Sequence, residues 1–463
     1  MPATFRHLVV LMLENRSFDH MLGFLKSPAY DIEGLSGGES NPGPNPGDPP
    51  VTVSRDARTV HDLNPDPGHD FINANIQIFG NASGQQTGPL MQGFVQDYAL
   101  VSNQAGHGAN IMKCFTEATL PVLSTLAKEF AICDHWFSSV PGSTIPNRLF
   151  VHGASSVGSL TQDVAIAPAR LKTIFEVMDD PANPDTYRIY TDGASVLLAN
   201  LYLAHHQGGF HPYSDFRSDC ANGDLPAYTF IEPSYDDDAA NGKYARSQHP
   251  DFPVDEGEGL ILEVYTAIRN SAMWNDTLLL ITYDEHGGLY DHVPPPSLTA
   301  DPAYPPVPAA KEPAFAFDRL GVRVPAVFVS PHIPRGTIIT RRFDHCSIVA
   351  TVRKMFCTDK APFNWREAQA ATFDDILTLN QARQDRVTPP NPVASPPPAG
   401  AGARVPPAVK KPTDLSLQMA RAMQYSMDTM GLHPTMKVSQ IYSAQDASNY
   451  LRQAADLVKG RHR

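Results

Sequence analysis

The segment TLLLITYDEHGG at residues 277–288 joins a largely apolar run to a polar, glycine-containing ending. The segment FRHLVVLMLEN at residues 5–15 has the same design, an apolar run followed by Glu14 and Asn15. Apolar runs this short, with a polar stop, are typical of strands that are buried on both faces of a parallel sheet. We therefore expect two central strands, each of which ends in polar side chains.

Further apolar runs alternate with helical patterns along the chain. Residues 130–137 and 324–330 predict two more strands. Apolar residues at helical spacing predict helices over residues 120–130, 255–268 and 348–356, and residues 255–258 look like a capping box at the start of the second. Strands that alternate with helices favour a doubly wound α/β fold, in which helices flank a mostly parallel sheet.

The C-terminal part of the chain has a different composition. Residues 386–412 contain nine prolines and predict a linker between an α/β domain at residues 1–385 and a helical appendage at residues 413–463. Within the appendage, a helical stripe carries Met419, Met423, Met427 and Met430, and residues 443–459 predict a second amphipathic helix. The stripe either packs on the core or adapts to a partner or a lipid interface.

Charge and targeting signals exclude several classes of protein. Lys and Arg number 36 against 49 Asp and Glu, a net charge of −13, which argues against nucleic acid as a partner and against electrostatic adhesion to anionic membranes. The five cysteines are widely spaced without a CxxC motif, as expected of buried thiols. No apolar run approaches the ~20 residues of a membrane span. No export signal is evident, so we expect a cytoplasmic protein, with non-classical export left open.

Polar side chains follow both of the decisive strands. Glu14 and Asn15 end the first, and Asp284 and Glu285 end the second. Ligands of open α/β sheets bind at the carboxyl ends of the strands. Carboxylate and amide oxygens from two such ends together predict a site for a hard divalent cation such as Mg²⁺, Ca²⁺ or Mn²⁺, and a nearby histidine would shift the preference toward Zn²⁺ or Fe. Either cluster alone is equally compatible with a capped turn.

A third motif, VPGSTIPNRL, covers residues 140–149 and follows the strand predicted at 130–137. Thr144 offers a hydroxyl nucleophile, and Arg148 offers a fixed positive charge. A metal ion beside Thr144 would lower the pKa of its hydroxyl and activate it at neutral pH. The alternative is a surface turn with a proline at its corner.

Three histidines complete the set of candidate residues, and no nucleotide-binding loop or nucleophile elbow stands at a predicted strand end. His69, His249 and His345 stand in the motifs DPGH, HP and FDH. The sequence has no GxGxxG or Walker loop of the correct spacing and no GxSxG nucleophile elbow after any of the predicted strands, so it gives no support for a nucleotide cofactor or an α/β-hydrolase triad.

The motifs VLMLENRSFDH (10–20), CDHWFSSVPGSTIPNR (133–148) and TYDEHGGLYDHV (282–293) together resemble the bacterial and plant phosphoesterase family. Its members include plant non-specific phospholipase C, bacterial phosphocholine-type phospholipase C and acid phosphatase A. The resemblance covers about residues 5–385 and is greatest to the plant-type enzymes. It implies an alkaline-phosphatase-like α/β fold and makes residues 1–385 a phosphoesterase catalytic domain.

The resemblance also implies roles for single residues. Thr144 would be the nucleophile, and His69 and His249 would act at the phosphate. Asn147, Arg148 and His345 would contribute to substrate binding. One divalent metal ion (Ca, Mg, Mn or Zn) would be held by a set of five residues: Glu14, Asn15, Thr144, Asp284 and Glu285.

The activity that the resemblance implies is that of a metal-dependent phospholipase C, which cleaves glycerophospholipids to diacylglycerol and a phospho-headgroup through a phosphothreonine intermediate. Such a substrate brings transient contact with a membrane surface. Because no export signal is evident, an acid phosphatase that acts on soluble phosphate monoesters is an alternative. A non-catalytic phospholipid-binding module is a second alternative, although intact Thr144, Glu14, Asn15 and Asp284 speak against it. The sequence leaves the oligomeric state open.

Overall fold

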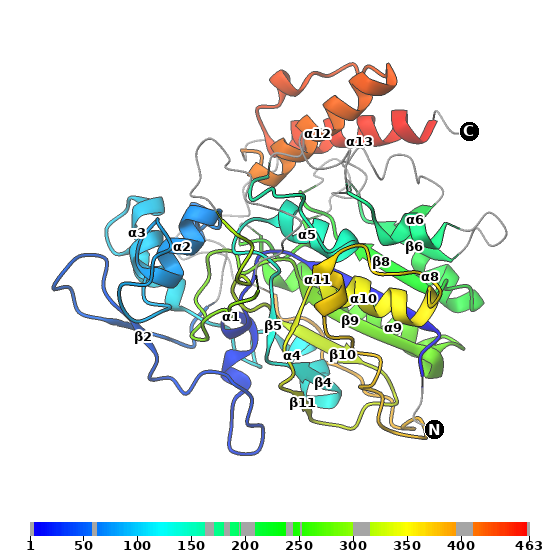
Figure 1. The fold of residues 1–463 in the computed structure, drawn as a ribbon, viewed down its shortest axis with the longest axis horizontal. Coiled ribbons are helices and arrows are strands. Elements are labelled where there is room, and N and C mark those ends of the chain that lie inside the picture. Colours follow the sequence, from blue (N-terminus) through cyan, green and yellow to red (C-terminus); the bar gives the residue numbers. More distant parts are fainter. Residues whose placement is uncertain are drawn as a thin grey trace.

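The computed structural model describes residues 4–57, 63–162, 171–179, 186–193, 195, 209–237, 244–250, 252–299, 315–394 and 411–460. Its centre is an eight-stranded sheet with helices on either side (Figure 1). In spatial order the strands are β11 (Thr337–Ile339), β4 (Ala131–Cys133), β10 (Ala326–Val329), β9 (Thr277–Tyr283), β1 (His7–Leu13), β8 (Tyr228–Glu232), β6 (Tyr187–Thr191) and β7 (Phe210–Pro212). The doubly wound, mostly parallel α/β fold expected from the sequence is thus confirmed.

Strands β1 and β9 pair in parallel at the middle of the sheet, with Leu13 opposite Tyr283. Every residue of β9 is buried, and all residues of β1 are buried except His7 at its start. The two segments that decide the fold therefore end at the same edge of the sheet. This register is what brings the polar side chains that follow them together.

Strand β10 runs antiparallel to both of its neighbours, β9 and β4. The sequence predicted this strand but not its direction. An antiparallel neighbour needs no helical crossover, and the described residues between β9 and β10 contain no helix. The run predicted at 130–137 is divided between β4 in the main sheet and β5 (Trp136–Phe137), which pairs with β12 (Phe343–Asp344).

The helices form two packed groups and a C-terminal pair. One group contains α4 (Pro121–Glu129), α8 (Tyr213–Asn222) and α9 (Val254–Asn270); the other contains α5 (Thr144–Gly153), α6 (Ile174–Met178), α10 (Cys346–Phe356) and α11 (Trp365–Gln369). The shorter α1 (Phe18–Leu22) and the pair α2 (Phe71–Phe79) and α3 (Phe94–Ser102) lie toward one side (Figure 1). The helices predicted at 120–130, 255–268 and 348–356 correspond to α4, α9 and α10.

The capping box expected at the start of α9 is wrong. The N-cap of α9 is Pro253, and no side chain caps it. The Glu258 carboxylate instead accepts hydrogen bonds from the backbone N–H groups of Val122 (2.7 Å) and Leu123 (2.8 Å) in the first turn of α4. That helix begins after Leu120, which has no side-chain acceptor of its own, so α9 supplies the missing cap.

The C-terminal helices α12 (Asp414–Met430) and α13 (Ala444–Gly460) pack on each other and lie beyond α5 (Figure 1). Met419, Met423 and Met427 are buried in a core that also includes Ile145 and Leu149 of α5. For these three methionines the packing interpretation of the stripe is confirmed. The side chain of Met430 and residues 395–410 of the predicted linker lie outside the described residues, and the domain boundaries stay predictions.

Candidate active site

The ends of β1 and β9 are joined by hydrogen bonds through one carboxylate. Asp284 Oδ1 accepts from the backbone N–H of Asn15 (3.0 Å) and from that of Glu285 (2.8 Å). Asn15 has a positive φ of 56°, which turns the chain sharply after the strand. The structure thus brings together the two strand ends that the sequence placed at one edge of the sheet.

The glycines of the DEHGG motif are required by this close approach. Gly287 has a φ of 64°, and a Cβ there would lie 2.1 Å from the carbonyl oxygen of Asn15. Gly288 has a φ of 69°, and its Cβ would lie 2.4 Å from the carbonyl oxygen of Gly68. Both positions combine a left-handed backbone with no room for a side chain, which only glycine accepts.

Thr144 is the first residue of α5, and its hydroxyl donates a hydrogen bond to Asn15 Oδ1 (3.1 Å). The neighbouring Ser143 hydroxyl is directed elsewhere and donates to Asp70 Oδ1 (2.8 Å). Of the two adjacent hydroxyls, Thr144 is therefore the one next to the strand ends. Its place at a helix N-terminus also favours negative charge developing on a ligand there.

Asn147 shapes the turn that presents Thr144. Its Oδ1 accepts from Val140 N (3.1 Å), and its Nδ2 donates to the carbonyl oxygens of Val140, Gly142 and Ser143. The side chain is fully buried and is engaged by this loop on both of its polar ends. The structure therefore places Asn147 behind the nucleophile, as a brace for residues 140–143.

Arg148 lies one turn further along α5 and is also buried. Its Nε donates to Asp284 Oδ2 (2.9 Å), and its Nη2 donates to the carbonyl oxygen of Leu13 (3.3 Å). A second carboxylate, Glu232 at the end of β8, lies 3.8 Å from Nη1. Arg148 thus ties the ends of three strands to the nucleophile helix.

Glu14 and Asp284 form a buried pair of like charges. Burial and then the neighbouring Asp284 raise the pKa of Glu14 well above its usual value. Burial also raises the pKa of Asp284, against the opposing charge of Arg148. Glu14 Oε1 is buried without a hydrogen-bond partner. A cation would stabilise both carboxylates, and the oxygens of Glu14, Asp284, Asn15 and Thr144 are the donors that a hard divalent ion prefers, so these residues fit a metal ion.

Two histidines and one acidic residue face one another beside this cluster. His69 Nε2 and His249 Nε2 lie 3.5 and 3.7 Å from Asp66 Oδ2. His69 Nδ1 lies 2.6 Å from Glu285 Oε1 and 3.4 Å from Asn15 Nδ2. The second oxygen of Glu285, Oε2, accepts a hydrogen bond from Gly287 N (2.7 Å). The two oxygens of Glu285 thus contact His69 and Gly287 rather than the Glu14–Asp284 pair.

The pKa values of the two imidazoles are shifted in opposite directions. Burial opposes protonation of His69, but the Glu285 carboxylate outweighs it and raises the pKa of His69 well above its usual value. Burial, and then the nearby His69, lower the pKa of His249 to about 3. Arg16 holds the loop of His249 through the carbonyl oxygens of Gln248 (2.6 Å) and His249 (3.3 Å). His69 therefore holds a proton more strongly than His249 over the same space.

His345 lies behind Asp284 with both ring nitrogens engaged. Trp136 Nε1 is a donor and lies 3.3 Å from His345 Nδ1, so Nδ1 accepts and Nε2 carries the proton. Nε2 donates to the Asp284 carbonyl oxygen (2.5 Å). Burial lowers the pKa of His345 to about 4, in keeping with a neutral ring. The structure does not bring His345 to the space between the other two histidines.

Three residues of the site were not singled out from the sequence. Glu232 is the last residue of β8, and no strand was predicted there from the sequence. Tyr235 donates to Glu232 Oε1 (2.9 Å) and lies with its ring 5.3 Å from the Arg148 guanidinium carbon. Asp66 stands in the DPGH motif with His69, and this spacing was the one signal that could have identified it.

The fold and the site together define an α/β enzyme in which a buried hydroxyl lies at a helix N-terminus beside a candidate cation site. The model of the phosphoesterase family matches residues 5–358. The chain belongs to this family, and it is accordingly a hydrolase of phosphoric esters.

Two named relatives match most of the chain. Non-specific phospholipase C6 of Arabidopsis thaliana is 41% identical over 397 residues, which cover 82% of this chain and 73% of the relative. Phospholipase C B of Mycobacterium tuberculosis is 28% identical over 439 residues, which cover 83% of this chain and 78% of the relative. An alkaline phosphatase superfamily structure from Vibrio parahaemolyticus covers 81% of this chain and 72% of its own, with 10% identity and a TM-score of 0.34. Among the described residues, none of the helices has the length and apolar character of a membrane span.

Proposed function

We propose that the chain is a phospholipase C that hydrolyses glycerophospholipids to diacylglycerol and a phosphorylated headgroup. The observation that carries the proposal is the hydrogen bond from the Thr144 hydroxyl to Asn15, beside the buried Glu14–Asp284 pair. The names of the Arabidopsis relatives, which match over most of the chain, support phospholipid as the substrate.

We propose one divalent cation, held by Glu14, Asn15, Thr144 and Asp284. When bound, it supplies positive charge that lowers the pKa of the Thr144 hydroxyl. The chain itself orients that hydroxyl through Asn15 Oδ1 and aims the N-terminus of α5 at the phosphate. Arg148 keeps Asp284 in place, and His345 holds the main chain of the same residue. Arg148, His345 and Asn147 are thus positioning residues, a revision of the substrate-binding role expected for them.

The reaction has two displacement steps. The Thr144 hydroxyl gives up its proton to water, and its oxygen bonds to phosphorus while the bond from phosphorus to the diacylglycerol oxygen breaks; the leaving oxygen takes a proton. His69 is suited to deliver that proton from Nε2, since Glu285 holds its Nδ1. Water then attacks phosphorus, the bond from phosphorus to the Thr144 oxygen breaks, that oxygen recovers a proton from the water, and the phosphorylated headgroup is released. His249, which faces the same space, binds a non-bridging phosphate oxygen.

The test compares wild type with Thr144→Ala and with Ser143→Ala as the matched control. Diacylglycerol is measured from phosphatidylcholine vesicles, and free phosphate is measured from a chromogenic monoester. We expect Thr144→Ala to lose at least about a thousandfold in turnover of vesicles, and Ser143→Ala to keep most of it because its hydroxyl faces Asp70. Equal losses in both variants would contradict Thr144 as the nucleophile.

The same assay distinguishes the alternatives. Turnover of the monoester alone would make the chain a phosphatase that acts on soluble phosphoesters. Binding to vesicles without any product, in protein loaded with Ca²⁺, Mg²⁺, Mn²⁺ or Zn²⁺ in turn, would favour a phospholipid-binding module. Metal analysis of the purified chain, before and after Glu14→Gln, tests the number and identity of the ions.

A further inference from the structure

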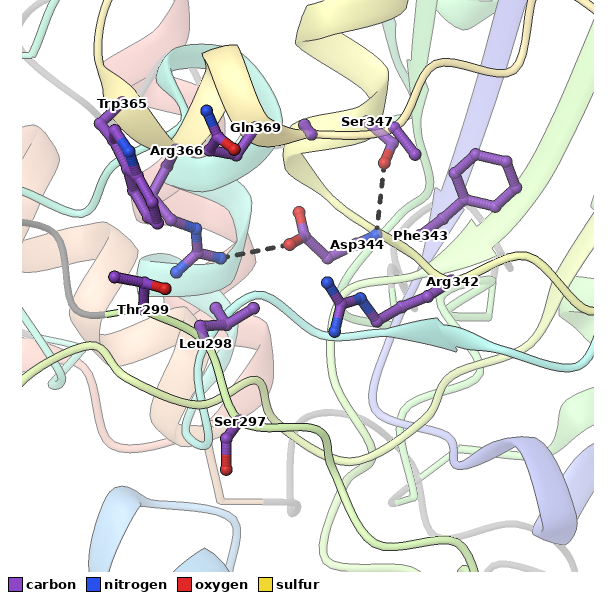
Figure 2. Close-up of a pocket in the computed structure, with 12 residues that line it drawn as sticks. Ser297, Leu298, Thr299, Arg342, Phe343, Asp344, Ser347, Trp365, Arg366 and Gln369 are labelled. Atoms are coloured by element: carbon purple, nitrogen blue, oxygen red, sulfur yellow. Dashed lines mark hydrogen bonds and ion pairs between the residues drawn. The ribbon is translucent and has the colours of Figure 1, made fainter.

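A polar cavity lies beside the segment at residues 342–347, which also carries His345. Its volume is about 290 Å³, close to the lower end of the roughly 300–1,000 Å³ typical of small-molecule sites. It is lined by β12, the start of α10, α11 and residues 297–299 (Figure 2). Figure 2 shows the guanidinium groups of Arg342 and Arg366 on two sides of the Asp344 carboxylate.

Arg366 is a buried cation with an unused donor. Its side chain is 5% exposed, and Nη2 donates to Asp344 Oδ2 (3.2 Å) and to the carbonyl oxygen of Ser139 (3.3 Å). Its Nη1 is buried and has no hydrogen-bond partner. An unpaired buried donor on a charged group is costly. Arg366 therefore has capacity for a further acceptor.

Asp344 does not neutralise both arginines. Its Oδ1 is occupied by the backbone N–H of Cys346 (2.6 Å) and by the Ser139 hydroxyl (3.3 Å). Its Oδ2 is taken by Arg366. Among the described residues, nothing pairs with the guanidinium of Arg342, whereas the adjacent Arg341 is held by Asp375 at 2.8 and 2.5 Å. Two cations and one carboxylate leave the cavity with one excess positive charge.

The remaining lining is suited to an anion with many acceptor oxygens. Ser347 and Thr299 supply hydroxyl donors, and Trp365 supplies a half-buried aromatic ring. Guanidinium groups match the geometry of phosphate oxygens and bind them with more than one hydrogen bond. The cavity is larger than a bare phosphate ion, which leaves space for a small organic group beside Trp365.

We propose that this cavity binds a phosphate-class anion at a site distinct from the catalytic one. Asp344 and Arg366 touch Ser139, in the loop that leads to Thr144, whereas the side chain of the next residue, His345, turns to Asp284. The two sites therefore share the segment around residues 344–345 but none of their proposed ligand-contacting side chains. Free phosphate and the phosphate of an anionic lipid headgroup have the same chemistry and are separated by experiment.

The test uses the full chain carrying Thr144→Ala, so that no substrate is turned over. Arg342→Gln removes the unpaired cation, and Arg341→Gln is the matched control, because it removes the same charge one residue outside the cavity. Inorganic phosphate is titrated in a calorimeter and by tryptophan fluorescence, with Trp365→Phe to assign the signal. We expect Arg342→Gln to weaken binding about tenfold, the loss of one charge-assisted contact, and Arg341→Gln to change it less than about twofold.

A second arm identifies the source of the phosphate. Co-sedimentation is measured with phosphatidylcholine vesicles with and without phosphatidic acid. Binding that depends on phosphatidic acid and on Arg342, but not on Arg341, supports a lipid headgroup, and an effect on inorganic phosphate alone supports a soluble ligand. The proposal is overturned if Arg342→Gln changes neither measurement or if both arginine variants change them equally. Neither readout requires turnover, so failure here is separate from failure of the proposed activity.

Discussion

Replacement of Glu258 by glutamine should remove a pH dependence of stability that this side chain gives the wild type. Glu258 lies on α9, is buried, and caps α4 through the N–H groups of Val122 and Leu123. Burial raises the pKa of Glu258 to about 7 from an ordinary 4.5, and the two N–H groups oppose this only in part. The protonated carboxyl is thus the form that the folded chain prefers.

The magnitude follows from the difference between the two pKa values. Between pH 4.5 and 7 the folded chain binds more protons at Glu258 than the unfolded chain does. The contribution of Glu258 to the free energy of unfolding is therefore greatest below pH 4.5 and falls as the pH rises through 7, by about 3 kcal/mol in all. Glutamine keeps one acceptor oxygen for the cap and carries no charge at any of these pH values.

The assay is urea unfolding of wild type and Glu258→Gln at several values between pH 5 and pH 8. Across this range we expect the free energy of unfolding of the variant to rise by about 2–3 kcal/mol relative to that of the wild type. The control is Glu263→Gln, which replaces an exposed carboxylate of the same helix. Its free energy of unfolding should differ from that of the wild type by a nearly constant amount. A difference between Glu258→Gln and wild type that stays constant within about 0.5 kcal/mol would refute the reasoning.

Three further predictions concern other parts of the chain. Burial opposes protonation of His292, but Asp19 outweighs it and raises the pKa of His292 to about 9. The contribution of His292 to the stability of the folded chain is therefore complete below pH 6.5 and is lost as the pH rises through 9. Melting curves of wild type should show this loss, and those of His292→Gln should not. Gly287→Ala should lower activity at least about tenfold, whereas Gly80→Ala, with a φ of 74° but open space around it, should cost only about 1 kcal/mol of stability in urea unfolding. Met423→Ala should destabilise α12 by about 2–5 kcal/mol, seen as faster hydrogen exchange there.

The central strands could be predicted because burial on both faces leaves a continuous apolar run. Strands β1 and β9 have that pattern. Strands β6 and β8 are equally buried but carry polar residues whose partners are remote, such as Arg188 of β6, which binds Asp219 and Asp224. Nothing local in the sequence distinguishes such a strand from an exposed one. The antiparallel direction of β10 could not be predicted, because its own residues form a buried apolar run like those of β1 and β9.

The same distinction applies to the site. Residues that follow a predicted strand could be placed at one edge of the sheet. The contact between Asn15 and Asp284 could therefore be predicted from the sequence. The partners of charged side chains could not be, since Glu285 is 216 positions from His69 and Glu258 is 136 positions from Val122. The direction in which a side chain points could not be predicted either. His345 and Asn147 stand in the expected motifs, yet their side chains bind the main chain of neighbouring loops.

Helix α5, which carries Thr144, packs against both the main core and the C-terminal helices. Phe150 and Val151 of this helix pack in the main core on the sheet, while Ile145 and Leu149 pack against α12 and α13. The nucleophile helix is therefore held between two cores. Tyr235 extends the second core to Arg148, and Ser416 of α12 donates to Asp236 (2.5 Å) in the same loop. The position of Thr144 is thus set from both sides, and helices α12 and α13 form one of the two supports.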